Sequence, residues 1–315
     1  MTATTTDLAG LAARARDHGP VYGADAHLVC DNVVRIFRST GVEVVALSGL
    51  DLLVDRGEMV AIIGPSGSGK STLLGILSGL DVPTAGVVRV AGHDLAGMGR
   101  RERLAYRRRV VGFVWQQTGR NLLPYLSARE NVALALAIGR GPARVARSRA
   151  DELLELMGVA SRRDQRPHQM SGGEQQRVAI AVALANAPEV LFADEPTGEL
   201  DSATSADVFA ALRHANTELG VTVVVVTHDA FVSSQVQRSI SIRDGRTSSE
   251  TLRRRAHAAD GDAAVVTEEY AVLDRAGRLQ LPRDFTAALN LRHRVRLELE
   301  TDHIGVWPEE VIDGD

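Results

Sequence analysis

The sequence contains very little cysteine, lysine or aromatic residue. Its 315 residues include one cysteine, Cys30, and aromatic side chains make up 4% of the total. A single cysteine cannot form a disulfide within the chain, so we expect a fold that does not depend on disulfides and a reducing compartment. Cys30 is then most simply a buried residue of a strand.

Long apolar segments are also missing. The longest apolar runs, 132–138 and 178–185, are far shorter than the roughly 20 residues that a membrane-spanning helix needs. Residues 1–27 lack the basic start and apolar core of a secretory signal, and we expect them to form a flexible arm. Any work at a membrane is therefore expected to require a partner protein.

Neither sign of charge dominates the chain. The 36 basic and 40 acidic residues give a net charge of -4, which provides no whole-chain basis for binding nucleic acid or anionic lipid. Of the 36 basic residues, only Lys70 is a lysine. An arginine fork cannot replace a compact ammonium in every site, so position 70 is predicted to require the lysine.

The residues around Lys70 form a strand, a glycine loop and a helix. Residues 59–63 are continuously apolar, as in a strand buried on both faces, and residues 73–77 have apolar side chains at helical spacing. The segment between them fits GxxxxGK[ST], the pattern of a phosphate-binding loop. Its predicted binding residues are Gly64, Pro65, Ser66, Gly67, Ser68, Gly69, Lys70, Ser71 and Thr72. Lys70 is expected to reach the β- and γ-phosphates and Ser71 to bind Mg²⁺.

Two carboxylates follow a second buried strand. Residues 190–193 are apolar and lead directly into Asp194 and Glu195. Ligands of parallel sheets bind at the carboxyl ends of the strands, so we expect both carboxylates beside the phosphate loop. Asp194 is predicted to hold the metal through water, and Glu195 to orient or deprotonate an attacking water.

The remaining pattern predicts an α/β fold. Residues 28–37 and 42–54 alternate apolar and polar side chains, which favours antiparallel strands. Residues 127–170 have a helical pattern that begins with a possible capping box at Ser127 and Glu130. Apolar strands at 190–193 and 221–226 are separated by helical sequence at 206–219. Strands that alternate with helices indicate a mostly parallel sheet.

Four further segments follow the order of a known family. They are Phe113-Val114-Trp115-Gln116, Met170-Ser171-Gly172-Gly173-Glu174-Gln175, Gly198-Glu199-Leu200-Asp201 and Thr227-His228-Asp229. With the two phosphate motifs, residues 28–246 resemble the nucleotide-binding subunit of ATP-binding cassette (ABC) transporters. The resemblance implies a P-loop ATPase of ABC type, with a mostly parallel core sheet, an antiparallel β subdomain and an α-helical subdomain. It also implies ATP and Mg²⁺ as cofactors and hydrolysis of ATP to ADP and phosphate.

The resemblance assigns a role to each motif. Ser171, Gly172 and Gly173 bind the γ-phosphate of ATP that is held by a second copy, so two copies close head to tail over two nucleotides. Gln116 senses Mg²⁺ and the attacking water and leads into a permease contact. His228 binds the γ-phosphate, and Asp201 positions the opposing site. Phe37 stands where the family places an aromatic residue that stacks on adenine; the alternative is an ordinary core phenylalanine.

Shorter segments point to one branch of the family. Residues 77–84, 121–124 and 195–198 resemble the branch of lipoprotein-release, macrolide-efflux and cell-division ATPases. This resemblance implies a homodimer that drives a separately encoded membrane permease, for export or for transmission of force. Such a subunit is cytoplasmic and peripheral, on the inner face of the cell membrane.

The C-terminal part is expected to be a separate unit. After a linker at 247–262, residues 263–315 resemble the swapped-hairpin β domain of bacterial transition-state regulators and antitoxins. This leaves a soluble nucleotide-gated regulator that acts on DNA as the alternative function. Residues 263–315 carry 6 arginines and 11 acidic residues, a net charge of -5, which repels phosphate and makes nucleic acid an unlikely partner. So short a unit cannot enclose a core alone, and we expect it to dimerise.

Overall fold

The computed structural model describes residues 22–39, 41–138, 143–198, 200–229, 232, 234–257, 263–274, 277–291 and 294–308. Most of the expected N-terminal arm, part of the expected linker and the last seven residues lie outside this set. No described helix is long and apolar enough to cross a membrane.

The core is a seven-stranded sheet in the order β11-β10-β9-β3-β8-β7-β6. Strands β9 (Arg238–Arg243), β3 (Met59–Ile63), β8 (Thr222–Thr227), β7 (Val190–Asp194) and β6 (Val111–Val114) pair in parallel. Strands β3, β8, β7 and β6 are short, mainly apolar runs that are largely buried, which is typical of a parallel sheet covered on both faces. The predicted mostly parallel core is confirmed.

A second, antiparallel sheet covers part of the first. Its order is β2 (Val42–Val54), β1 (Leu28–Ser39), β4 (Ala85–Val90) and β5 (His93–Asp94). Cys30 is fully buried on β1 opposite Leu52 of β2, as the sequence predicts. The antiparallel β subdomain is thereby confirmed.

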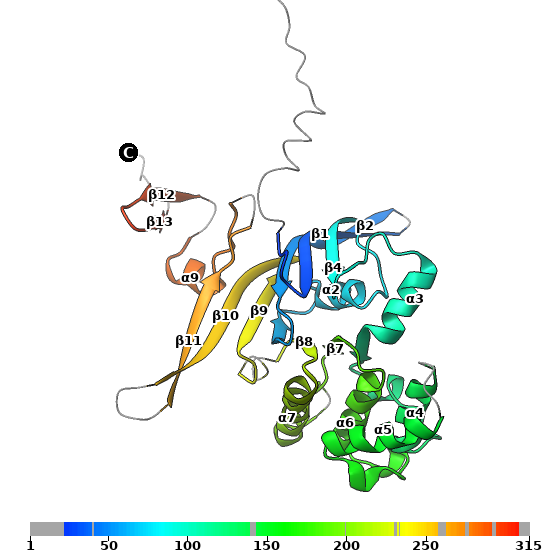
Figure 1. Ribbon diagram of the computed structural model, residues 1–315. Helices are drawn as coiled ribbons and strands as arrows, with labels where there is room; N and C mark the ends of the chain where they lie inside the picture. The colour runs from blue at the N-terminus through cyan, green and yellow to red at the C-terminus, as the bar shows by residue number, and fades with distance from the viewer. Residues whose placement is uncertain are drawn as a thin grey trace, which may run out of the picture.

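The described chain also forms six α-helices before residue 220. They are α2 (Lys70–Leu77), α3 (Arg100–Arg109), α4 (Ala128–Ile138), α5 (Ala143–Leu156), α6 (Gly172–Leu184) and α7 (Ser202–Leu219). The capping box before α4 is present: the Ser127 amide donates to Glu130 Oε2 at 2.8 Å, and the Glu130 amide donates to Ser127 Oγ at 3.2 Å. Helices α4, α5, α6 and α7 gather in the lower part of Figure 1, apart from the β1-β2-β4 sheet.

Two hydrophobic clusters lie on opposite faces of the core sheet. Alternate residues of β3 and β8 separate cleanly: Ala61 and Val225 belong to the cluster with α4–α7, whereas Ile62 and Val224 belong to the cluster with α2 and the antiparallel sheet. Successive side chains of a strand point to opposite faces. The core sheet is therefore the middle layer of three, and its carboxyl edge carries the loops described below.

The C-terminal part differs from the expected linker and separate unit. Strand β10 (Arg246–His257) pairs antiparallel with β9, and β11 (Ala263–Ala271) pairs with β10, so both extend the core sheet. Side chains also link β10 to the core: Arg238 of β9 forms ion pairs with Glu250 of β10 at 2.8 Å and with Glu58, just before β3, at 3.2 Å. Of the described elements, only the helix α9 (Arg283–Ala288) and the two-stranded sheet of β12 (Val295–Leu299) and β13 (Ile304–Pro308) lie beyond β11, at the left of Figure 1.

Candidate functional site

The glycine loop joins the carboxyl end of β3 to the start of α2. Gly69 has a φ of 102°, and a Cβ there would lie 2.5 Å from the carbonyl oxygen of Ala46 on β2. A Cβ on Gly64 would collide with the carbonyl oxygen of Ile242. The loop therefore needs glycine at both positions, because the β2 and β9 backbones press against it.

Lys70 is the first residue of α2, and its side chain is folded into this loop. Its Nζ donates to the carbonyl oxygens of Gly64 at 2.7 Å and Pro65 at 2.9 Å. Burial lowers the pKa of Lys70, while the carboxylates of Glu195 and Asp194 act in the opposite direction. The buried Oγ of Ser68 has no hydrogen-bond partner in the described part of the chain. A buried ammonium, an unpaired hydroxyl and an exposed rim of Pro65, Ser66 and Gly67 fit a loop built for a phosphate group.

Three of the predicted catalytic residues form one cluster. Glu195 Oε1 lies 2.8 Å from His228 Nδ1, and Gln116 Nε2 donates to Glu195 Oε2 at 3.2 Å. The three residues follow β6, β7 and β8, which are neighbours in the core sheet, and Lys70 follows β3, the next strand. Residues at the carboxyl ends of adjacent parallel strands meet at one edge, as the sequence argument expects.

Asp194, at the end of β7, is close enough to both Glu195 and Lys70 to feel their charges. Its pKa is raised by burial and by the negative charge of Glu195, and Lys70 opposes this effect. A divalent cation would relieve the repulsion between the two carboxylates. The predicted Mg²⁺ donors, Ser71, Gln116 and Asp194, offer the oxygen atoms that Mg²⁺ prefers. Among the described residues, no group of three His, Cys, Asp or Glu could hold a metal by itself.

Ser171 caps the helix α6 and opens a second polar surface. Its Oγ accepts from the Glu174 amide at 3.3 Å, and its own amide donates to Glu174 Oε2 at 2.8 Å. Arg162 binds the other oxygen of Glu174 at 2.8 Å. Hydrogen bonding from the Ser171 backbone is the main cause of the lowered pKa of Glu174. Ser171 and Gly172 remain exposed, so this helix start is open to an anion.

Asp201 caps the helix α7. Its Oδ1 accepts from the amides of Ala203 and Thr204 at 3.0 Å, and Oδ2 accepts from the Thr204 hydroxyl at 2.7 Å. The hydrogen bonds from Thr204 lower the pKa of Asp201. Within this chain its contacts are those of a helix cap, and the preceding Glu199 lies outside the described residues.

Phe37 is not a core residue. It is 41% exposed on β1, two residues beyond Arg35, which pairs with Leu47 of β2. The Leu47 side chain lies against Gly69 of the glycine loop. Phe37 is thus an exposed aromatic ring on the hairpin that touches the loop, which excludes the alternative of an ordinary buried phenylalanine.

Arg35, which no sequence motif predicts, lies against the Phe37 ring. Its guanidinium carbon is 4.4 Å from the centroid of the Phe37 ring. The available signal was its position two residues before the aromatic, which places both side chains on one face of the strand.

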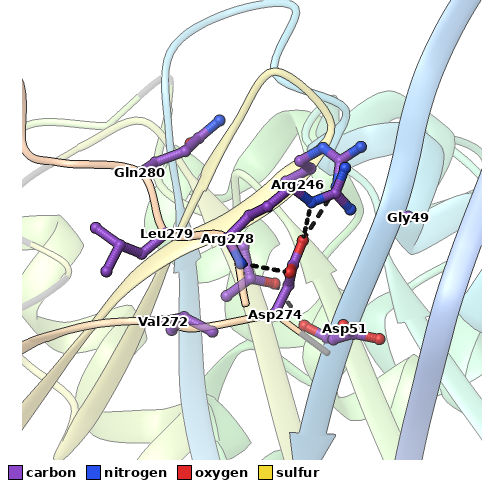
Figure 2. Close-up of a pocket in the computed structure, with 9 residues that line it drawn as sticks. Gly49, Asp51, Arg246, Val272, Asp274, Arg278, Leu279 and Gln280 are labelled. Carbon is purple, nitrogen blue, oxygen red and sulfur yellow. Dashed lines mark hydrogen bonds and ion pairs between the residues drawn. The ribbon is translucent and has the colours of Figure 1, made fainter. Parts of the chain in front are cut away.

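A separate pocket of about 360 Å³ lies where β2 and β10 meet the segment that follows β11 (Figure 2). Arg246 Nη1 and Arg278 Nε approach Asp274 Oδ2 at 3.4 Å and 2.7 Å. None of the predicted site residues line it; its lining is Gly49, Asp51, Arg246, Thr247, Val272, Asp274, Arg278, Leu279 and Gln280.

Comparisons with known proteins identify the family. A family model described as ABC transporter matches residues 47–198. The lipoprotein-releasing system ATP-binding protein LolD 2 of Caulobacter vibrioides is 46% identical over 222 residues, which cover 70% of this chain and 96% of the relative. The macrolide export ATP-binding/permease protein MacB of Rhodopseudomonas palustris is 47% identical over 226 residues, 70% of this chain but only 34% of that protein.

The solved structures show the same similarity. The structure described as a dimeric post-hydrolysis state of an ATP-binding cassette bound to ADP and Pi has 41% identity and a TM-score of 0.64. The match covers 71% of this chain and 97% of that one.

Proposed function

Since the chain belongs to the family of ABC transporter ATP-binding proteins, we propose that it is the ATP-hydrolysing subunit of a transporter whose permease is a separate protein. The observation that carries this function is the cluster of Gln116, Glu195 and His228 beside Lys70. Four adjacent parallel strands deliver these side chains to one edge of the sheet. That edge combines a phosphate cradle with a carboxylate base, which is what hydrolysis of a triphosphate needs.

The chemistry is mainly positioning and charge neutralisation. The loop amides and Lys70 bind the phosphates of ATP, and His228 contacts the γ-phosphate. Ser71, Gln116 and Asp194 would hold Mg²⁺, which supplies positive charge to the phosphate oxygens when it is bound. Glu195 orients the attacking water and accepts its proton, while its contacts with His228 and Gln116 fix the carboxylate.

Each site is completed by a second copy of the chain. Ser171 and Gly172 are exposed and form no hydrogen bond with the glycine loop anywhere in the described structure. A head-to-tail homodimer would place them on the γ-phosphate held by the partner copy, with Asp201 at the same interface. The dimeric form of the similar cassette supports this arrangement.

The relatives suggest the kind of permease. Lipoprotein-releasing and macrolide-export proteins are similar over most of the ATPase part. We assign this chain to that branch, as a cytoplasmic subunit on the inner face of the membrane that drives export or transmits force. No described feature favours the alternative of a regulator on DNA.

We also propose that the part beyond β11, made of α9, β12 and β13, provides a second contact between copies through a swapped-hairpin arrangement. A sheet of two strands is marginal in water without further packing. Here its apolar side chains and those of α9 and its C-cap are exposed: Phe285, Leu289, Leu297, Leu299, Ile304 and Trp307. A second copy of the same unit would bury them.

The substitution Glu195→Gln tests the ATPase assignment. It keeps the size of the side chain but removes the base, so hydrolysis should fall by about 100-fold or more. ATP binding should persist, and light scattering with ATP should show a stable dimer. Near-normal hydrolysis by this variant, or absence of nucleotide binding by folded wild-type protein, would overturn the proposal.

Light scattering without nucleotide tests the C-terminal contact. Leu297→Asp with Leu299→Asp should increase the fraction of monomer. The matched control is Val42→Asp with Val44→Asp on β2, whose side chains are similarly exposed. Equal monomer fractions in the two variants would rule out the proposed C-terminal contact, but they would not affect the ATPase assignment.

A further inference from the structure

Arg35 is held on two sides. Its Nε and Nη2 donate to Asp81 Oδ2 and Oδ1 at 2.9 Å and 2.8 Å, a two-pronged contact that fixes the plane of the guanidinium. The same group lies 4.4 Å from the centroid of the Phe37 ring. The Arg35 side chain is only 23% exposed, so both contacts are partly shielded from water.

Asp81 is itself fixed to the helix of the glycine loop. Its amide donates to the carbonyl oxygen of Gly75 in α2 at 2.9 Å, and its Oδ1 accepts from the Val82 amide at 2.7 Å. Arg35 therefore connects the helix that begins at Lys70 with the strand that carries Phe37. In Figure 1, α2 lies directly beside the sheet of β1 and β2.

The glycine loop lies beside the hairpin that carries Phe37. At the start of α2, Gly69 lies against Ala46 and Leu47 of β2, and Leu47 is opposite Arg35 in the sheet register. Phe37 is two residues further along β1, opposite Val44, which is about 7 Å along the strand. The phosphate loop and the aromatic ring are thus neighbours on one surface, with Arg35 between them along β1.

We propose that Arg35 is a positioning residue for the base of the nucleotide. Its guanidinium supports one face of the Phe37 ring and leaves the other face for adenine, so that base, ring and guanidinium form a stack anchored to α2 by Asp81. This inference rests on the proposed function, since it concerns the same ATP site. Phenylalanine has no hydroxyl with which to fix its own orientation, and a cation above the ring fixes it instead.

The test compares a nucleotide with its phosphates alone. Affinities for ATP and for inorganic tripolyphosphate are measured by calorimetry for the wild type, Arg35→Gln and Arg38→Gln. Arg38 is a matched control because it adjoins Phe37 and pairs with Glu43 at 3.0 Å, but is 75% exposed. Arg35→Gln should weaken ATP binding about three- to tenfold and tripolyphosphate binding less than about twofold. Arg38→Gln should leave the affinity for ATP and the affinity for tripolyphosphate unchanged.

Coupling to Phe37 gives a second readout. In a Phe37→Ala background, Arg35→Gln should have almost no further effect on ATP affinity, because the stack is already gone. Arg35→Lys, which keeps the charge and an ion pair with Asp81 but not the flat surface, should give an intermediate loss. The lysine variant serves as the test if Arg35→Gln does not fold.

Three results would overturn the inference. Equal weakening of ATP and tripolyphosphate would mean that Arg35 acts through the fold or through its charge. Tighter ATP binding by Arg35→Gln would mean that the guanidinium covers the face that adenine needs, and unchanged ATP affinity in both Arg35 variants would mean that the stack contributes nothing. Failure of the folded wild type to bind either ligand would instead count against the proposed function.

Discussion

Glu195 and His228 are placed 2.8 Å apart, Oε1 to Nδ1, by the pairing of two parallel strands. Asp194 of β7 is opposite Val226 of β8, and the Glu195 amide donates to the Val226 carbonyl oxygen at 2.8 Å. Glu195 has a φ of 43°, an unusual value for a residue with a side chain, and the turn it makes directs the carboxylate toward the next strand. Backbone pairing thus sets the geometry of the site before any substrate binds.

Removing the histidine should slow hydrolysis more than it weakens binding. In His228→Ala, Glu195 loses one of its two side-chain partners, and we expect hydrolysis to fall by about 100-fold in single-turnover assays. ATP affinity should change by only about threefold, since the loop and Lys70 remain. His168→Ala, an exposed histidine in the 3-10 turn Pro167–Gln169, is the control, and equal rates in the two variants would contradict the assigned role.

Lys70→Arg should weaken nucleotide binding although the charge is kept. The ammonium sits 2.7 Å and 2.9 Å from two loop carbonyls, and a planar guanidinium is too large for that space. We expect at least about a tenfold loss of ATP affinity, or 1.4 kcal/mol, measured by fluorescence of a nucleotide analogue. Affinity like that of the wild type would show that position 70 needs only a positive charge. The control is Arg38→Lys, the reverse exchange at an exposed position.

Glu174 should make the stability of the protein depend on pH. Its pKa is held low by the hydrogen bond from the Ser171 backbone and by Arg162. A carboxylate with a depressed pKa stabilises the fold above its ordinary pKa of about 4.3, and this contribution is lost as the pH falls through the lower, folded value. Wild type should therefore exceed Glu174→Gln in stability at pH 7, by less than about 1 kcal/mol because the pair is near the surface.

That difference should shrink as the pH falls below about 4, and it should vanish once the pH is below the depressed pKa of Glu174, where the carboxyl is protonated in the folded protein as well. Urea unfolding at several pH values measures it. Glu155→Gln, at an exposed position of α5, should show no such trend, and a stability gap that widens toward acid would contradict the expected direction.

Asp274→Ala should release the segment that follows β11. The variant removes the shared partner of Arg246 and Arg278 and leaves the two positive charges facing each other. Loss of such a partly buried pair shifts a local opening equilibrium by about tenfold. Trypsin cleavage after Arg278 should accelerate accordingly, whereas Asp302→Ala, whose carboxylate contacts the neighbouring His303, should leave the rate unchanged.

The phosphate loop and the strand-end residues could be predicted because their signals are local. A buried strand, a glycine loop and a helix follow one another within twenty residues, and the rule for carboxyl ends of parallel strands then brings Glu195 and His228 together. The order of the motifs along the chain carried the family resemblance, which the comparisons confirm.

Other features depend on contacts that no local pattern reveals. Arg35 and Asp81 are 46 residues apart, and they meet because the segment that follows α2 returns to β1. Strand β10 is too polar to show an alternating pattern; it is held by its backbone ladder and by the bridges of Arg238 to Glu58 and Glu250. The pairing of Arg246 with Asp274 likewise depends on a contact between distant segments, so no local pattern of the sequence predicts it.

Strand β3 has little room to shift within the packed core. It has five residues; Val60, Ala61 and Ile62 are completely buried, on alternating faces, and Gly64 follows immediately. A larger side chain at Ala61 would displace the strand toward the opposite layer and carry the glycine loop with it. A conservative apolar change deep in the interior can therefore lower nucleotide affinity without touching the ligand, and a screen that scores only contact residues would overlook it.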